Sequence, residues 1–553
     1  MKEYSHISGT YYQSICVGQV SRLALFSISL VEKAMRIHYF IIQGLALLTL
    51  ATQAIAQDIP RTESGKPFFQ GLWQAQTRAA YNLEGHAARH DMPAGHSVVE
   101  GRSIPYLPEA LAARNTNYAN RKALDPLSKC YLPGPTRIMA MPWPFQIFQT
   151  DEHVAITFEW TQVYRLIYAA GQEPYYPGFE HFMGDSRGHW EGDTFVVEIR
   201  DLNDRTWLDA AGNFFANSTV ITERYTMEDA DTILYQATFE DPSLYSQPWS
   251  MSFPLIRQKN MPRLLEFQCQ AEVEEANGDF ERVDNLWYPA PIPSDNVPFS
   301  YSGEDDPALP EVPASISRQE YGVPDISGYF MADHGGANYG LEKRENLAMF
   351  PPARGVVINP NNRVLPYQKW AREEMIERRE AWRGYDDPTA HCFVAGIPRS
   401  HYVPSPFFIL QPPGYVVILH ERMSYRVIPL DGREHLPNHI RLWMGDAVGH
   451  WENDSLIVES SNYNGKAWLN ELGDVISHAQ TVRESYTPVS DSQIIYRATV
   501  SDPIVYYRPW TIEMALNKQD EELLEVACLE DNNDLQHLKD VRDEHRASLG
   551  QEN

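Results

Sequence analysis

An internal repeat constrains this chain more than any other feature of its sequence. The stretch MGDSRGHWEGDTFVVE at 183–198 returns as MGDAVGHWENDSLIVE at 444–459, an offset of 444 − 183 = 261. The same offset relates Trp249 to Trp510, so a long central region of the two copies aligns without a gap. Preserved spacing over such a length indicates preserved strand register and therefore one topology used twice.

The repeat predicts the domain organisation. A chain of 553 residues is long enough for several packed cores. The two copies place homologous domains at 65–285 and 322–535. Between them, 286–321 is rich in proline and acidic residues and predicts a linker. The last residues, 536–553, are expected to form a charged tail.

Within each copy, short apolar segments alternate with turn residues. The first copy contains eight segments that predict antiparallel strands: FQIFQT, HVAITFEW, QVYRLIY, DTFVVEI, STVITERYT, TILYQATFE, WSMSFPLI and LLEFQCQ. Helices are predicted only over Pro108–Leu124 and Gln368–Arg383, at corresponding places in the two copies. Consecutive strands with few helices favour a mainly β chain of two antiparallel barrels, with a sandwich as the alternative. The GLW at Gly71–Trp73 resembles the Gly-x-Trp of lipocalin and calycin barrels, which implies a similar barrel here.

The N-terminus carries an export pattern. From Met35 the chain has a basic start, an apolar run and a small-x-small end, which predicts a signal peptide at 35–56. Residues 1–34 contain no targeting pattern, so Met35 is the expected start of translation. A retained membrane anchor over Phe40–Ala56 is the alternative. No later segment has the roughly 18 apolar residues needed to span a bilayer, so the mature protein is expected in the periplasm or outside the cell.

The cysteines fit an exported protein. Two lie in each copy, and their separations match: 269 − 130 = 139 and 528 − 392 = 136. Duplication favours disulfides between Cys130 and Cys269 and between Cys392 and Cys528, although four buried free thiols are the alternative. No CxxC pair is present, so thiolate zinc and thioredoxin-type sites are not indicated.

Charge and motif content exclude several function classes. With 74 acidic and 46 basic side chains, the formal charge of −28 disfavours nucleic acid and anionic membranes as partners. The sequence has no P-loop, dinucleotide fingerprint, HExxH or GxSxG. One histidine cluster has no counterpart in the second copy and lies in a Gly- and Pro-rich stretch, so it predicts a surface loop, with a metal site as the alternative; it contains His86, His90, Asp91 and His96. We therefore expect neither a cofactor nor a metal.

The repeated motif has a structural and a catalytic interpretation. Gly192 and Asn453 are the residue types that best tolerate positive φ, so each motif predicts a hairpin, with Trp190 and Trp451 packed against the barrels. In the catalytic interpretation, acid, cation and base meet at the mouth of a barrel. Its residues are Asp185, Arg187, His189 and Glu223. The second copy has Ala447 and Val448 in place of Ser186 and Arg187, which favours the structural interpretation.

At other positions, it is the second copy that carries charged residues which the first copy lacks. Copy two has DGREH where copy one has AGQEP, whereas copy one has Arg224 where copy two has Ser485. Three interpretations are open. Each copy holds a partial site, the two partial sites combine across an interface, or the differences are ordinary sequence divergence in loops and salt bridges. The candidate ligand-binding residues are Trp190, Trp207, Arg165, Arg224, Asp431, Arg433, His435, Asp446, His450 and His478.

Several motifs together resemble a known family. YLPGPTR, PFQIF, MGDSRGHWEGDTFVVE, TWLD, EDP and QPWS are similar to those of an uncharacterised family of secreted bacterial proteins, usually present as single copies. The resemblance covers nearly the whole mature chain as a tandem duplication. It implies export and architecture, and it implies no catalytic residues.

Two classes of function remain after these exclusions. The first is an exported two-barrel protein whose aromatic-rich interiors bind a small apolar, aromatic or sugar-like ligand. The second is a cofactor-free hydrolase, lyase or isomerase in which His189 or Asp185 moves a proton while an arginine stabilises the developing anion. A structural or interaction protein of the cell envelope is a third possibility.

Overall fold

The computed structural model describes residues 59–270, 295–301, 307–345, 351–380, 383–530, 532 and 534–548. Residues 59–553 form one compact unit. The start region at 1–34 and the signal peptide predicted at 35–56 lie outside the described residues, as do 286–294 and 302–306 of the expected linker. None of the helices in the described part has the length and apolar character needed to cross a membrane.

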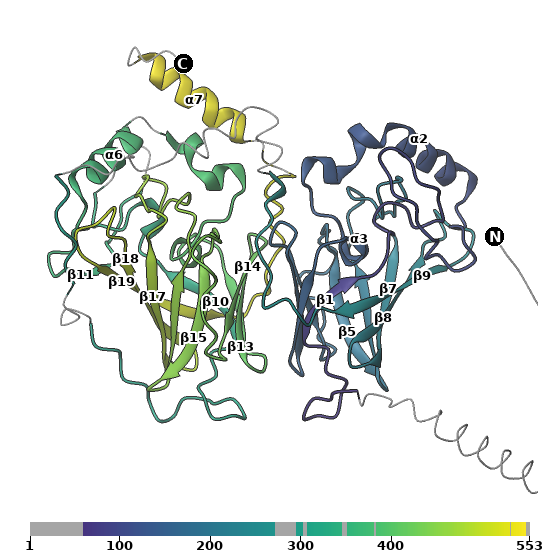
Figure 1. Cartoon of the computed structure of the whole chain (residues 1–553), viewed down its shortest axis with the longest axis horizontal. Coiled ribbons are helices and arrows are strands. Elements are labelled where there is room, and N and C mark those ends of the chain that lie inside the picture. Colours follow the sequence, from purple (N-terminus) through teal and green to yellow (C-terminus); the bar gives the residue numbers. More distant parts are fainter. Residues whose placement is uncertain are drawn as a thin grey trace, which may run out of the picture. The chain divides into compact units, whose positions relative to one another are not determined.

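The first copy folds into a closed nine-stranded barrel (Figure 1). Neighbouring strands in the chain are neighbours in the sheet, and β1 pairs with β9 to close the ring. All pairings are antiparallel except a single parallel bridge between β4 and β5. The strands are β1 (Gly71–Ala75), β2 (Phe145–Gln149), β3 (His153–Phe158), β4 (Tyr164–Tyr168), β5 (Asp185–Glu191), β6 (Thr194–Arg200), β7 (Val220–Asp229), β8 (Thr232–Glu240) and β9 (Trp249–Arg257).

The second copy repeats this order in a sheet that is nearly closed. The strands β14 and β15, which correspond to β4 and β5, end the sheet without pairing, and the short β11 adds to β19. The strands are β10 (Gly328–Asp333), β11 (Val357–Asn359), β12 (Phe407–Leu410), β13 (Tyr415–His420), β14 (Ser424–Pro429), β15 (Asp446–Glu452), β16 (Ser455–Ser461), β17 (Thr481–Ser490), β18 (Gln493–Ser501) and β19 (Trp510–Gln519). The predicted fold class, two mainly antiparallel barrels with few helices, is therefore confirmed.

One predicted strand is wrong. LLEFQCQ, at 264–270, pairs only through an isolated bridge between Phe267 and Trp160. Instead of joining a sheet, this segment and its equivalent after β19 each cross to the opposite copy, and their side chains make contacts there. The eight predicted segments also omitted β1, which contains the GLW, and β5.

Each barrel interior is filled by side chains. Along β7 and β8 every second residue is buried, the period expected of strands with one face inward. Ile221 and Tyr225 of β7 and Tyr235 of β8 belong to the hydrophobic core of the first barrel. A matching core fills the second barrel. A ligand held inside the barrels, as in lipocalins, is not compatible with this packing.

The repeated motif forms a β-hairpin in both copies, as predicted. β5 and β6 pair in register around Gly192, and β15 and β16 pair in the same way around Asn453. Gly192 has φ 61° and Asn453 has φ 48°, so both occupy the left-handed region. Trp190 stacks on Phe69 with 5.4 Å between ring centroids and packs against the first core. Trp451 packs against the second core.

The helices lie at one end of each barrel (Figure 1). Helix α2 spans Pro108–Leu124, as predicted, α3 spans Pro135–Ala140, and α6 spans Lys369–Glu380. Helix α7 (Asp534–Ser548) occupies most of the expected charged tail. It is docked through the fully buried Arg542, which pairs with Asp386 at 3.2 Å.

Both predicted disulfides are present. Cys130 and Cys269 have Cα atoms 5.6 Å apart, and Cys392 and Cys528 have Cα atoms 5.7 Å apart. Each bond joins the segment before the second barrel strand, β2 or β12, to the segment that follows the last strand, β9 or β19. Disulfides are typical of an oxidising compartment.

The two copies pack against each other through the outer faces of β2–β4 and β12–β14. The apolar cluster between them contains Phe148, Ala155, Tyr164, Phe408, Leu410, Val417, Leu419 and Tyr425. Two tyrosines make reciprocal hydrogen bonds across it: Tyr164 donates to the carbonyl of His420 at 3.1 Å, and Tyr425 donates to the carbonyl of Phe158 at 2.9 Å. These strands are buried on both faces, which explains their nearly continuous apolar sequences.

Candidate functional site

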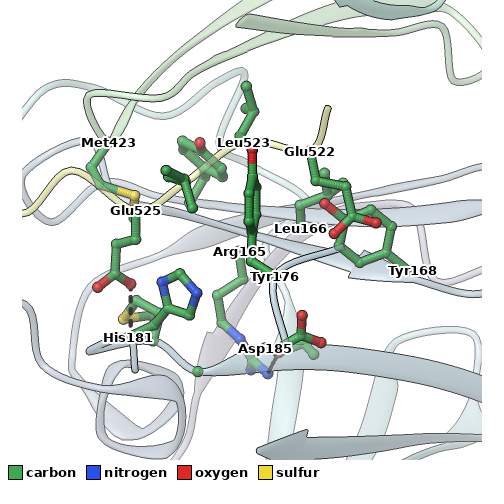
Figure 2. A pocket seen from close by; sticks show the side chains of 15 residues that line it. Arg165, Leu166, Tyr168, Tyr176, His181, Asp185, Met423, Glu522, Leu523 and Glu525 are labelled. Carbon is green, nitrogen blue, oxygen red and sulfur yellow. Dashed lines mark hydrogen bonds between the residues drawn. The ribbon is translucent and has the colours of Figure 1, made fainter. Parts of the chain in front are cut away.

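A small pocket lies at the seam of the first barrel, where β4 and β5 touch only through the bridge of Tyr168 with Arg187. Its volume is about 80 Å³. Residues Glu522 to Glu525, which follow β19 of the second copy, cover this seam pocket. Figure 2 shows Glu525 beside His181, and Glu522 beside Tyr168.

Glu525 joins the second copy to the first. Its two carboxylate oxygens accept the backbone N–H groups of Phe182 at 2.7 Å and Met183 at 2.9 Å. The equivalent Glu266 of the first copy accepts the N–H groups of Trp443 and Met444 in the second copy. Each copy therefore holds the loop before the other copy's hairpin. Burial raises the pKa of both carboxyls to about 7.

Asp185 and Arg187 lie at the same seam. Arg187 pairs with Asp185 through two hydrogen bonds of 2.5 and 2.6 Å and with Glu522 of the other copy at 2.8 Å. Its guanidinium lies over the ring of Tyr168, 4.0 Å from the centroid. These two candidate residues of the first copy are thus tied to Glu522 of the second copy across the interface.

The second barrel has an equivalent pocket of about 70 Å³ at its own seam. There Asp446 pairs with Arg263, which comes from the segment after β9 of the first copy. Asp446 also contacts Nδ1 of His435 at 3.0 Å. Arg433 pairs with Asp431 and donates to the carbonyl of Pro262 in the first copy at 2.8 Å.

Glu223 lies elsewhere, inside the first barrel. Its carboxylate pairs with Arg165 at 2.9 Å and accepts hydrogen bonds from the hydroxyls of Tyr225 at 3.0 Å and Tyr235 at 2.6 Å. All four side chains are buried. Every oxygen of this carboxylate is therefore already occupied by a donor.

The second barrel contains the same arrangement: Glu484 pairs with Arg426 and accepts from Tyr486 and Tyr496. It adds His401, whose Nε2 lies 2.7 Å from the hydroxyl of Tyr486. Because both copies keep the ion pair and its tyrosines, we interpret this cluster as a structural centre that fixes the barrel interior.

The remaining predicted residues are spread over the surface and the loops. His189 and His450 lie on the outer face of their hairpins with side chains 58% and 55% exposed, beside Glu191 and Glu452. Arg224 pairs with Glu191 at 2.5 Å on the same face. Trp207 is buried, and His478 is half-buried. Of Asp185, Arg187, His189 and Glu223, only Asp185 lines the seam pocket, so the structure does not bring the four together.

The histidine cluster near the N-terminus is held by other contacts. Both ring nitrogens of His86 lie within 2.9 Å of backbone carbonyl oxygens, and Asp91 pairs with Arg121 at 2.7 Å. Within the described residues, no group of three or more His, Cys, Asp or Glu side chains is arranged to hold a metal ion.

A larger cavity, about 270 Å³ in volume, lies at the second barrel beside the disulfide of Cys392 and Cys528. We call it the barrel-two cavity. Thr161 and Gln268 of the first copy also line it, so both copies build it. Sequence reasoning did not identify its residues, because they come from many loops and strand ends that lie far apart in the chain.

The walls of the barrel-two cavity combine apolar and polar side chains in similar amounts. Phe393, Val403 and Met423 provide apolar surface. Among its polar groups, Glu471 accepts a hydrogen bond from the side chain of Asn338 at 2.7 Å, and burial raises the pKa of this carboxyl. Arg422 is exposed and also lines the cavity.

The corresponding place in the first copy is occupied by the chain itself. Val394 of the cavity corresponds to Leu132 (394 − 132 = 262). The backbone N–H of Leu132 donates to the carboxylate of Glu530, a buried residue of the second copy, at 2.5 Å. Arg205 donates to the carbonyl of Glu530 at 2.9 Å. The two copies have therefore diverged at this position.

No family model matches this chain, and no curated protein matches it.

Proposed function

We propose that this protein is exported and binds a small apolar, aromatic or sugar-like molecule in the barrel-two cavity. The observation that carries the proposal is the cavity itself, with a volume of about 270 Å³ and both copies contributing to its wall. Ligand sites are typically concave and mainly apolar, with a few converging polar groups. The barrel interiors are packed, and the seam pockets are less than a third of this size.

The lining favours a compact amphipathic ligand. Typical ligand pockets have volumes of roughly 300 to 1,000 Å³, so this cavity suits a compact molecule of one to three rings. Phe393 and Met423 offer contact surface for a ring face. Glu471 and Asn338 offer an acceptor and a donor for a hydroxyl or amide group of the ligand.

Export is supported by two observations. Both disulfides close within their own copies, as in proteins of oxidising compartments. The sequence from Met35 to Ala56 has the pattern of a cleaved signal peptide. Under this proposal the chain is a tandem form of the secreted bacterial family that it resembles.

The test is a fluorescence titration with N-phenyl-1-naphthylamine, an apolar aromatic probe, with monosaccharides added as competitors. Val394→Trp places an indole on the cavity wall and is expected to weaken probe binding at least tenfold, with little change in the melting temperature. Leu111→Trp, on the exposed face of α2, is the matched control and should bind as the wild type does. Equal binding by Val394→Trp, or no binding of any probe by the wild type, contradicts the proposal.

A further inference from the structure

The two segments that cross between the copies carry opposite charges at equivalent positions. Aligning LLEFQC at 264–269 with LLEVAC at 523–528 places Arg263 opposite Glu522 in the repeat. Each lies across the interface from the conserved aspartate of the other copy's hairpin, Asp446 or Asp185. The two copies therefore differ in the sign of the charge, positive at 263 and negative at 522, at equivalent positions of the interface between them.

The site that receives Glu522 is built for an anion. Arg187 stands between Asp185 and Glu522 and pairs with both, and each of these three side chains is only 15% exposed. One cation is thus shared by two carboxylates. Without Arg187, Asp185 and Glu522 would be two partly buried like charges at one seam.

The site that receives Arg263 is built for a cation. Val448 replaces the arginine found at 187, so Arg263 is the guanidinium that pairs with Asp446. Asp446 is 2% exposed, and its other contacts there are His435 and the backbone N–H of Leu436. The two positions in each site have changed together. The first site has Arg187 with Glu522, and the second has Val448 with Arg263.

We propose that these charges make the interface selective, so that each half of the chain fits the other half and rejects a second copy of itself. If the second half paired with its own kind, Glu522 would meet Asp446 at a site with valine instead of arginine at 448, where the nearby Arg433 is already paired with Asp431. If the first half paired with its own kind, Arg263 would meet an Asp185 that Arg187 already neutralises. The first of these pairings brings together the like charges of Glu522 and Asp446, and the second brings together those of Arg263 and Arg187. Like charges at a partly buried contact are destabilising, so both pairings are disfavoured.

The glutamates next in the same segments do not discriminate. Glu266 and Glu525 both accept two backbone N–H groups from the opposite copy. Backbone donors are the same in either pairing, so these contacts provide affinity without selectivity. Selectivity therefore depends on the pairs at 187 with 522 and at 448 with 263.

The experiment uses the full chain and four variants. Arg263→Glu and Glu522→Arg should each lower the melting temperature by about 3 °C or more. The double swap, which keeps net charge constant, should be lower than either single variant. Arg263→Glu combined with Val448→Arg copies the Asp185, Arg187 and Glu522 arrangement into the second site and should restore most of the loss. A neutral double swap, or no rescue by Val448→Arg, overturns the proposal.

A second measurement follows pairing directly. A site-specific protease sequence is inserted within 286–294, ahead of the residues 295–301 that hydrogen-bond the second barrel, and is cut after the chain has folded. The wild-type halves should elute together as one 1:1 species, whereas the double-swap halves should separate or re-pair with their own kind. Homodimers of wild-type halves would contradict the proposal, because the charges would then fail to select the partner.

Discussion

Removing the carboxylate of Glu525 should loosen the contact between the copies, and more strongly at acid pH than at alkaline pH. In Glu525→Ala, the backbone N–H groups of Phe182 and Met183 lose their acceptor. Both residues are 4% exposed, so these donors have little access to water. Each unsatisfied buried donor costs roughly 1 to 3 kcal/mol, which gives about 2 to 6 kcal/mol for the pair.

The pH dependence follows from the raised pKa of the carboxyl. Burial raises the pKa of Glu525 from an ordinary 4.5 to about 7, so folding favours its protonated form. Its contribution to the free energy of unfolding is therefore fully present below pH 4.5 and is lost as the pH rises through 7. At about 1.4 kcal/mol for each pKa unit, the wild type loses at most about 3 to 4 kcal/mol over this window. Glu525 is partly exposed, which makes this figure an upper bound.

Because the alanine variant has no carboxyl at this position, its destabilisation should shrink by up to about 3 kcal/mol between pH 5 and pH 8. The assay is urea denaturation followed by tryptophan fluorescence at both pH values. Glu228→Ala, at an exposed site on β7, is the control and should show no such change. Glu266→Ala should repeat the result at the other seam. A destabilisation of Glu525→Ala that is the same at pH 5 and pH 8 would refute the reasoning.

Four further predictions concern stability and can be checked by thermal denaturation. Gly192→Val should cost about 1 to 2 kcal/mol from backbone strain alone, because no atom lies within 4 Å of an added Cβ; Gly192→Asn should be tolerated, since Asn453 occupies the same turn position. His189→Ala should leave both the melting temperature and probe binding unchanged, because its side chain is 58% exposed on the hairpin. Glu484→Gln should destabilise the second barrel by roughly 3 to 5 kcal/mol, since its buried arginine partner loses its counter-ion. Cys269→Ser should destabilise the first barrel by roughly 4 to 5 kcal/mol in the chain-entropy model, and reduction of the wild type should approach the same loss.

Much of the fold is predictable from the sequence because its determinants are local. The turn residues Gly192 and Asn453 fix the hairpins, and the two-residue period of β7 and β8 fixes which side chains face inward. The predicted range of α2 matches the structure. The strand prediction for 264–270 is wrong because its apolar residues pack against the other copy and do not form a hydrogen-bonded strand pair.

The sites are less predictable because they form between distant segments. Arg187 meets Glu522 across 335 residues, and nothing local to either residue indicates the other. A signal does exist in the repeat: where Arg187 becomes Val448, the residue equivalent to Glu522 becomes Arg263. Paired charge changes between copies of a repeat thus indicate contact. The barrel-two cavity has no such signal. It is open in the second copy, whereas Glu530 occupies the corresponding place in the first copy.

The most direct test of the central claim is hydrogen exchange measured by mass spectrometry with and without saturating N-phenyl-1-naphthylamine. If the probe binds in the barrel-two cavity, exchange should slow in peptides covering 393–406 and 420–424, which line this cavity, and should not change in β5 to β9 of the first barrel. Protection confined to the first barrel, or to the interior strands of either barrel, would contradict it.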